Sequence, residues 1–237
     1  MSIQRISLTA GLLLALLLQG LAWADDTALY KEARERMVRT QIQSRNVNDP
    51  GVLAAMNTVP RHLFVPERYR DKSYEDHPLP IGSGQTISQP YIVAFMTELL
   101  RLGPEDKVFE LGTGSGYQAA IASRVAGSVY TVEIYQDLAD AARQRLETLG
   151  FTNVHARHGD GYFGWEEEAP FDAIIVTAAA DHIPPPLIKQ LKPGGRLVIP
   201  LGSPFSIQQL VLVTKDMTGK IEERAIIAVR FVPLLGH

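Results

Sequence analysis

The chain has 237 residues, of which 46% are hydrophobic and 21% charged, which is ordinary for a folded globular protein and excludes a disordered chain. Its formal net charge of −3 at pH 7 gives no sign of a surface for nucleic acid or anionic membranes. The absence of cysteine excludes disulfide bonds, a thiolate nucleophile and a cysteine-ligated metal site.

Residues 1–24 have the layout of a secretory signal peptide. One basic residue, Arg5, precedes a leucine-rich run, and the small-x-small triplet that ends at Ala24 is a suitable cleavage site. Removing this leader takes the net charge of the chain from −3 to −4, because the leader carries one positive and no negative charge. We expect a mature chain of residues 25–237 in the periplasm, without stable membrane association. An uncleaved N-terminal anchor is the alternative, although the apolar run is short for a span of roughly 20 residues.

Residues 25–105 are expected to form an N-terminal helical part that packs against the rest of the domain. Apolar residues four apart from Leu29 to Met37, with Ile42 one turn further on, predict a first helix. A turn at 49–51 and a short second helix follow, and Pro60 ends that helix.

The stretch LPIGSGQTISQP, residues 79–90, has too many glycine, proline and small polar residues to build a core. It predicts a tightly turned polar loop. A helix follows at once, and Pro90 suits its first position.

Beyond residue 105 the pattern alternates strands with helices, as expected for a cofactor-binding sheet over 106–237. This alternation predicts an α/β fold with a doubly wound, mostly parallel sheet whose final pair of strands is antiparallel. The predicted strands are 107–112, 128–133, 153–160, 171–180, 194–202, 209–216 and 225–234. The predicted helices between them are 117–126, 138–150 and 184–192.

A glycine-rich turn, ELGTGSGYQAA, connects the first of these strands to its helix. Gly112, Gly114 and Gly116 allow a ligand to approach the backbone, and the helix N-terminus offers unpaired N–H groups. The G-x-G-x-G spacing is not the dinucleotide fingerprint G-x-G-x-x-G, and no Lys-Ser or Lys-Thr follows as in a P-loop. A purely structural strand-to-helix turn is the alternative.

Three carboxylates surround this turn in the predicted sheet. Glu133 ends the second strand, where a carboxylate accepts hydrogen bonds from two ribose hydroxyls. Asp160 follows the third strand and is placed to accept from an adenine amino group, while Glu110 lies near the position of a cationic ligand group. An acidic, phosphate-free site suits S-adenosyl-L-methionine. The alternatives are an ordinary surface carboxylate for Glu133 and a turn-forming role for Asp160.

With these residues in view, the chain closely resembles the protein-L-isoaspartate O-methyltransferase family from about Met37 to Leu234. The resemblance implies the Rossmann-like seven-stranded methyltransferase fold. It also implies protein and peptide substrates that carry L-isoaspartyl or D-aspartyl residues, and no nucleic-acid partner. The most specific stretches are VPRHLFVPE, LPIGSGQTISQPYIVAFMTELL, ELGTGSGYQAA, GDGYFGW, APFDAIIVTAAA, LKPGGRLVIPLG and VRFVPL.

The same resemblance assigns Ser88 as the active-site residue, with Thr86 beside it. A helix-capping hydroxyl is the alternative reading of Ser88. No metal is expected, because the histidines show no metal-ligand spacing. The residues expected to bind the cofactor are Glu110, Gly112, Thr113, Gly114, Ser115, Gly116, Glu133, Asp160 and Gly161.

The implied reaction is attack of a substrate carboxylate oxygen on the sulfonium methyl group. A free carboxylate has a pKa near 4 and needs no general base at neutral pH. The rival functions are methylation of a small molecule and a non-catalytic cofactor-binding module, whereas the glycine spacing argues against a nicotinamide-dependent oxidoreductase. We expect a monomer. The leader departs from the family pattern, which is typically cytoplasmic, so the cytoplasm is the alternative location.

Overall fold

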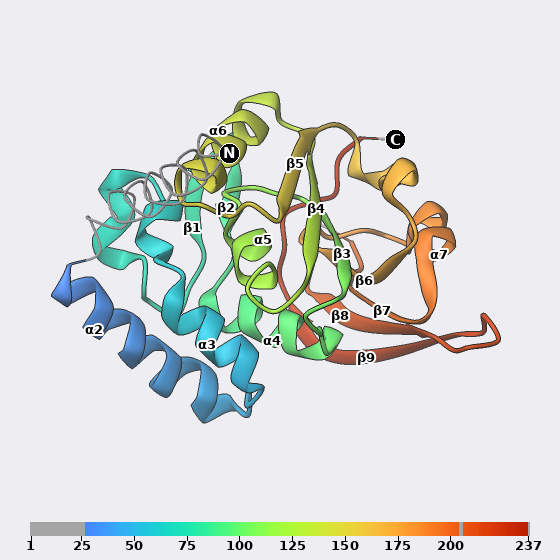
Figure 1. Ribbon diagram of the computed structural model, residues 1–237, viewed down its shortest axis with the longest axis horizontal. Coiled ribbons are helices and arrows are strands. Elements are labelled where there is room, and N and C mark those ends of the chain that lie inside the picture. Colours follow the sequence, from blue (N-terminus) through green and yellow to red (C-terminus); the bar gives the residue numbers. More distant parts are fainter. Residues whose placement is uncertain (1–26, 204–205, 237) are drawn as a thin grey trace, which may run out of the picture.

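The structure is a computed structural model that describes residues 27–203 and 206–236, and the expected leader lies outside the described residues. A seven-stranded sheet runs through the molecule and has helices on both faces (Figure 1). The strands are β3 Lys107–Leu111, β4 Ser128–Glu133, β5 Val154–His158, β6 Phe171–Val176, β7 Leu191–Leu201, β8 Gln208–Lys215 and β9 Ile221–Val229. The helices are α2 Ala28–Met37, α3 Pro50–Thr58, α4 Pro90–Leu100, α5 Tyr117–Ala122, α6 Gln136–Thr148 and α7 Pro185–Gln190.

The strand order is β5-β4-β3-β6-β7-β8-β9. The five strands from β5 to β7 are parallel, and β8 is antiparallel to both of its neighbours. Each of the seven predicted strands lies in this sheet, and the predicted antiparallel final pair is confirmed. The chain winds outward in both directions from β3 and β6, so the order reverses between these two strands.

Alternating side chains of the central strands build a core on each face of the sheet. Val108 packs with residues of α4 and α5, whereas the next residue, Phe109, packs with residues of α7 on the opposite face. A strand that is covered on both faces is mostly apolar, which is why β6 reads as a continuous hydrophobic run from Ala173 to Val176.

The N-terminal part differs in one detail from the predicted pattern. Met37 and Ile42 are fully buried, but Leu29 is 72% exposed. The reason is that α2 begins at the outer edge of the molecule, where the described chain does not cover its first turn (Figure 1). Beyond Met37 the helix continues as a π-helical turn, Val38–Ile42, which brings Ile42 into the core.

The stretch predicted as a polar loop is a β-hairpin, formed by β1 Leu79–Gly82 and β2 Gln85–Ile87. Its tip places Gly82, Ser83 and Gly84 at positive φ, a conformation that glycine adopts without strain. The Ser83 hydroxyl donates to the carboxylate of Asp137 on α6 (2.7 Å), which fastens the tip to the sheet domain.

Helix α4 begins at Pro90, as predicted from the suitability of proline for a first helical position.

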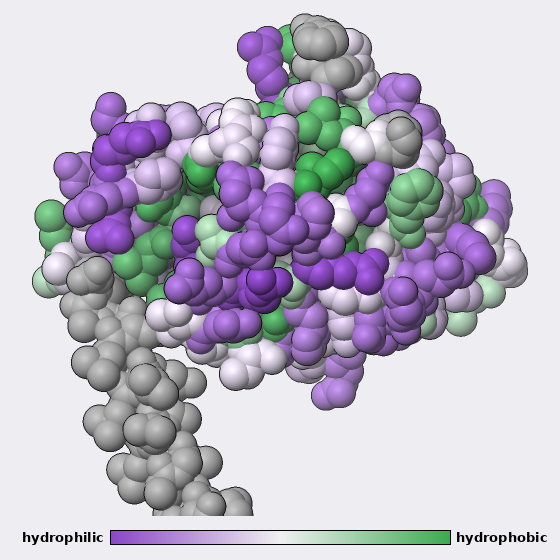
Figure 2. All heavy atoms as spheres, turned by 90° about the horizontal axis from the view of Figure 1, so that it is seen from above, coloured by the Kyte–Doolittle hydropathy of each residue, from purple (hydrophilic) through white to green (hydrophobic). Residues whose placement is uncertain are grey.

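Polar and charged side chains cover most of the face seen in Figure 2, with apolar side chains in smaller patches between them. Within residues 27–203 and 206–236, no helix is long and apolar enough to span a membrane.

Candidate active site

The carboxyl ends of β3 and β6 meet where the strand order reverses, which is where open α/β sheets bind their ligands. Gly112 follows β3 and Thr177 follows β6. The Thr177 hydroxyl lies 2.6 Å from the Gly112 carbonyl oxygen and 2.9 Å from the Leu111 carbonyl oxygen, to which it donates. A cavity opens at this point between the glycine turn, the end of β4 and the C-terminal segment.

The glycine turn has a backbone shape that requires glycine. Gly112, Gly114 and Gly116 have φ angles of 96°, 53° and 85°. A Cβ on Gly112 would lie 2.3 Å from the Thr177 hydroxyl oxygen, so any side chain there would collide. Thr113 and Ser115 are buried between the glycines, and both line a second cavity beside the first.

Glu133 holds this turn from the end of β4. Its Oε2 accepts from the Gly114 N–H at 2.7 Å, and its Oε1 accepts from the Tyr135 N–H at 3.1 Å. Glu133 also lines the first cavity, and a carboxylate has lone pairs for further donors. Among the described residues that line this cavity, Glu133 supplies a carboxylate and none is a lysine, arginine or histidine. The donor set therefore fits a cationic, phosphate-free cofactor such as S-adenosyl-L-methionine.

Asp160 directly precedes Gly161 and does not itself line the cavity. Its Oδ1 accepts from the Tyr162 N–H at 2.9 Å and so caps the short 3₁₀ turn Gly161–Phe163. The turn-forming role that the sequence left open is thus present in the structure. Gly161 lines the cavity directly.

Glu110 lies behind the glycine turn and lines none of the cavities described here. It is fully buried, its Oε2 accepts from the Thr131 hydroxyl at 2.5 Å, and its Oε1 has no hydrogen-bond partner among the described residues. Burial, with a smaller contribution from the charge of Glu133, raises the pKa of Glu110 to about 8, although the Thr131 hydrogen bond opposes this rise. Glu110 therefore does not face the cavities described here, and its place beside a cationic ligand group stays a prediction.

The C-terminal segment after β9 forms a wall of the cofactor cavity that the sequence did not reveal. The predicted strand 225–234 ends at Val229, and the chain beyond it crosses the carboxyl edge of the sheet. Leu234 donates its N–H to the Ala179 carbonyl oxygen at 2.8 Å, and Leu235 lines the cavity. Gly236 packs on Asp160: a Cβ there would lie 2.4 Å from the Asp160 Oδ2.

Thr86 lies on β2 and Ser88 directly after it, and both line the second cavity together with the glycine turn. Both line a larger cavity of about 460 Å³, together with Arg230 and Phe231. The Ser88 hydroxyl makes no hydrogen bond within the described part of the chain, and α4 has Gln89, not Ser88, at its N-cap position. Ser88 therefore does not cap the helix, and its hydroxyl is available to a ligand.

Two residues line both the cofactor cavity and the larger cavity: Thr86 and Thr177. These two residues lie where the two cavities adjoin, and we call this place the passage. Thr177 was not singled out in the sequence, where it reads as part of an apolar strand. Its signal was a hydroxyl residue at the carboxyl end of a buried strand next to the glycine turn.

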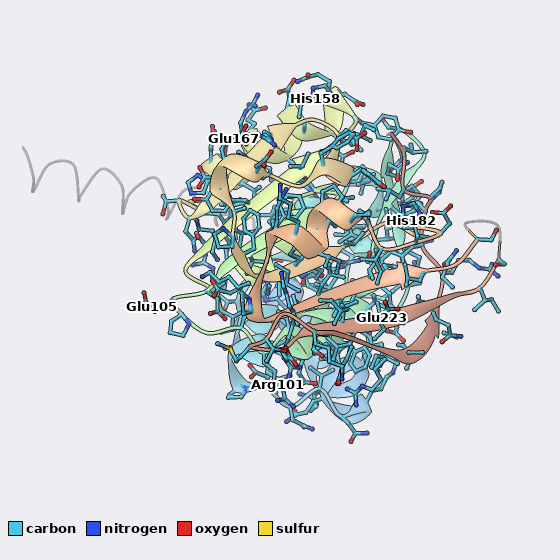
Figure 3. All side chains as sticks on the ribbon, turned by 90° about the vertical axis from the view of Figure 1, so that its right-hand side faces the viewer. Arg101, Glu105, His158, Glu167, His182 and Glu223 are labelled. Carbon is cyan, nitrogen blue, oxygen red and sulfur yellow. The ribbon has the colours of Figure 1, made fainter. Side chains whose placement is uncertain are left out.

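The described part of the chain has no cluster of side chains that could bind a metal ion. No group of three or more histidine, aspartate or glutamate side chains there could hold a metal ion. His158 and His182 lie well apart in Figure 3.

Comparisons with known proteins give one consistent result. The sequence profile of the protein-L-isoaspartate (D-aspartate) O-methyltransferase family matches residues 32–237. The protein-L-isoaspartate O-methyltransferase 2 of Shewanella sediminis is 58% identical over 212 residues, which cover 90% of this chain and 86% of that protein. The protein-L-isoaspartate O-methyltransferase 1 of Nitrosospira multiformis is 57% identical over 211 residues, which cover 88% and 89%.

Two solved structures share the fold over most of the chain. A protein-L-isoaspartate O-methyltransferase has a TM-score of 0.77 at 31% identity, with 86% of this chain and 66% of that chain covered. A putative protein-L-isoaspartate O-methyltransferase from Plasmodium falciparum, in complex with S-adenosyl-L-homocysteine, has a TM-score of 0.72 at 26% identity, with 85% and 98% covered.

Proposed function

The chain belongs to the protein-L-isoaspartate (D-aspartate) O-methyltransferase family, and from this premise we propose the reaction that its two joined cavities carry out. The enzyme transfers a methyl group from S-adenosyl-L-methionine to the free carboxylate of L-isoaspartyl and D-aspartyl residues in damaged proteins. The supporting observation is the arrangement of two cavities. The described lining of the first contains the Glu133 carboxylate and no basic side chain. It shares Thr86 and Thr177 with a larger cavity that Ser88, with its hydroxyl, also lines.

Cofactor binding falls to the residues around the glycine turn. Backbone N–H groups at the start of α5 and the carboxylates of Glu133 and Asp160 would hold the nucleoside and amino-acid parts of the cofactor. The cofactor supplies an electrophilic methyl group. Thr86 and Thr177 would line the path along which that group meets the substrate.

The substrate carboxylate is already ionised at neutral pH, so the protein has to orient it rather than deprotonate it. The Ser88 hydroxyl is a neutral donor and orients a carboxylate without the lasting attraction of a lysine. As the carboxylate oxygen bonds to the methyl carbon, the carbon–sulfur bond breaks, which gives a methyl ester and S-adenosyl-L-homocysteine. A backbone amide nitrogen of the substrate then attacks the ester carbonyl carbon, which releases methanol and closes a succinimide without help from the enzyme. Hydrolysis of that ring returns some normal aspartate.

An assay of methyl acceptors tests this function against small-molecule methylation. Purified protein with methyl-labelled S-adenosyl-L-methionine would receive either an isoaspartyl peptide or a panel of small carboxylic acids. Base-labile label on the peptide supports the proposed function. Label on a small acid but not on the peptide would overturn it and leave the cofactor site intact.

For the location of the protein, we propose export by the leader of residues 1–24, supported by the order of Arg5, the apolar run and Ala24. N-terminal sequencing of protein from fractionated cells checks this. A periplasmic chain that begins at Asp25 is expected, and cytoplasmic protein that begins at Met1 would contradict it. We also propose that the mature chain works as a monomer, because the residues proposed for the reaction, Ser88, the glycine turn and Glu133, come together within one chain.

A further inference from the structure

A buried arginine joins the two halves of the site. Arg61 begins the 3₁₀ turn Arg61–Phe64 and has no exposed surface. Its Nη2 donates to the Ser88 carbonyl oxygen at 2.7 Å, and its Nε donates to the Ser73 carbonyl oxygen at 2.7 Å. The guanidinium therefore fixes the backbone of Ser88, which lines the substrate cavity.

The same guanidinium also contacts the cofactor side. Its central carbon lies 4.9 Å from the centre of the Tyr117 ring. Tyr117 is the first residue of α5, directly after Gly116 of the glycine turn, and only 1% of it is exposed. One planar cation thus lies between the substrate loop and the start of the cofactor-binding helix.

Packing alone does not explain this arginine. No carboxylate lies within ion-pair distance of Arg61 in the described part of the chain, although buried charges are usually paired with an opposite charge. Burial lowers the pKa of Arg61 to about 10, so the side chain is still a cation at neutral pH. Its charge is stabilised by two carbonyl oxygens and an aromatic ring, and an apolar residue of similar size would avoid the desolvation cost.

We propose that Arg61 is a positioning residue for methyl transfer, which sets the Ser88 loop at a fixed distance from the glycine turn. This inference rests on the proposed function. A displacement of about 1 Å between reacting groups can cost on the order of 100-fold in rate, so a residue tied to both sides of the passage controls turnover.

The test compares Arg61→Lys with Arg34→Lys. A lysine keeps the charge, but its single ammonium does not reproduce the planar fork that reaches both carbonyl groups and the ring. Arg34 is a matched control, because it is also buried (4% exposed) and donates to a backbone carbonyl oxygen, that of Asn57, at 2.7 Å.

For Arg61→Lys we expect kcat to fall roughly 10- to 100-fold, while the Kd for S-adenosyl-L-homocysteine changes by less than about threefold. Hydrogen exchange of the segment 85–89 should become faster, even without substrate. Arg34→Lys should have a similar loss of melting temperature and a kcat within about twofold of wild type. Equal kcat in the two variants, or unchanged exchange at 85–89, would overturn the proposal.

A second pair of variants keeps the proposal testable if Arg61→Lys does not fold. Tyr117→Phe retains the ring against the guanidinium, and Tyr117→Leu removes it. We expect Tyr117→Leu to lower kcat more than tenfold below Tyr117→Phe, and equal values would contradict Arg61 positioning. Wild-type protein that binds cofactor but does not methylate isoaspartyl peptide would instead defeat the proposed function itself.

Discussion

Ser88 lines the substrate cavity, and its backbone carbonyl oxygen accepts a hydrogen bond from the buried Arg61. Substituting alanine removes the donor but leaves the carbonyl group that Arg61 binds. We expect Ser88→Ala to lower kcat about 100-fold, comparable with loss of one transition-state donor. The cofactor Kd should stay within about threefold, because Ser88 does not line the first cavity.

Steady-state kinetics and calorimetry with S-adenosyl-L-homocysteine would separate these two effects. Ser44→Ala, on an exposed turn, is the control and should match wild type. An equal loss of turnover and cofactor affinity in Ser88→Ala would assign the serine to the cofactor site instead.

Glu110 makes the stability of the ligand-free protein depend on pH. The folded-state pKa of Glu110 is about 8, above its ordinary value of 4.5, so the native state retains a proton that the unfolded chain releases. The contribution of this carboxyl is full below pH 4.5 and is lost as the pH rises through about 8. Urea unfolding at pH 5, 7 and 9 should show a decline in the free energy of unfolding that Glu110→Gln reduces.

The two proteins share every other titrating group, so the difference between their curves isolates Glu110. Parallel curves for wild type and Glu110→Gln would show that the carboxyl does not titrate in this range.

At the same residue scale, the sequence was sufficient to locate residues whose position follows from a local pattern. Gly112 and Glu133 were predicted because a glycine turn and a strand-end carboxylate are local patterns. Thr177 and Arg61 were missed, since each acts through carbonyl groups far along the chain. Thr177 bonds residues 65 and 66 positions away, and Arg61 bonds Ser88, which is 27 positions away.

At the scale of elements, the C-terminal segment after β9 forms one wall of the cofactor cavity, and we call this segment the strap. Gly236→Ala would place a methyl group against the Asp160 carboxylate and would strain a backbone at φ 95°. We expect the Kd for S-adenosyl-L-homocysteine to rise about tenfold or more, because one good polar contact is worth about 1.4 kcal/mol or more. Gly219→Ala is a matched control, with φ 89° and no atom within 4 Å of the added methyl group.

Gly219 lies in the turn between β8 and β9, so Gly219→Ala should bind cofactor like wild type. Calorimetry on both variants decides the question. Unchanged affinity in Gly236→Ala would mean that the strap does not shape the cofactor site.

Helices and strands were predicted correctly where burial of apolar residues determines the secondary structure. The prediction was wrong where turn geometry, or packing against other parts of the chain, determines which residues are paired or buried. Strand β4 has the predicted bounds, because a run of apolar residues between turns leaves little choice. The hairpin at 79–87 was predicted as a loop because its glycines and polar residues hide the strand period. Leu29 fits the predicted helical spacing but is exposed, because the spacing of apolar residues does not show which turns of a helix pack against the rest of the chain.

At the scale of the whole molecule, the sheet places one cavity on each side of the passage at Thr86 and Thr177. The N-terminal part supplies the substrate loop and the parallel strands supply the cofactor turn, and Arg61 lies between them. The fold class followed from strand alternation, and the expected chemistry followed from the resemblance of specific stretches such as VRFVPL to the family. The joining of the two cavities did not follow, because it depends on contacts between distant segments.

The most direct measurement of the central claim uses two peptides that differ only in one isoaspartyl or aspartyl residue. Each would be incubated with the purified protein and methyl-labelled S-adenosyl-L-methionine, and base-labile methyl ester would be counted. The proposed function predicts label on the isoaspartyl peptide alone. Equal label on both peptides, or label on neither while the cofactor still binds, would contradict it.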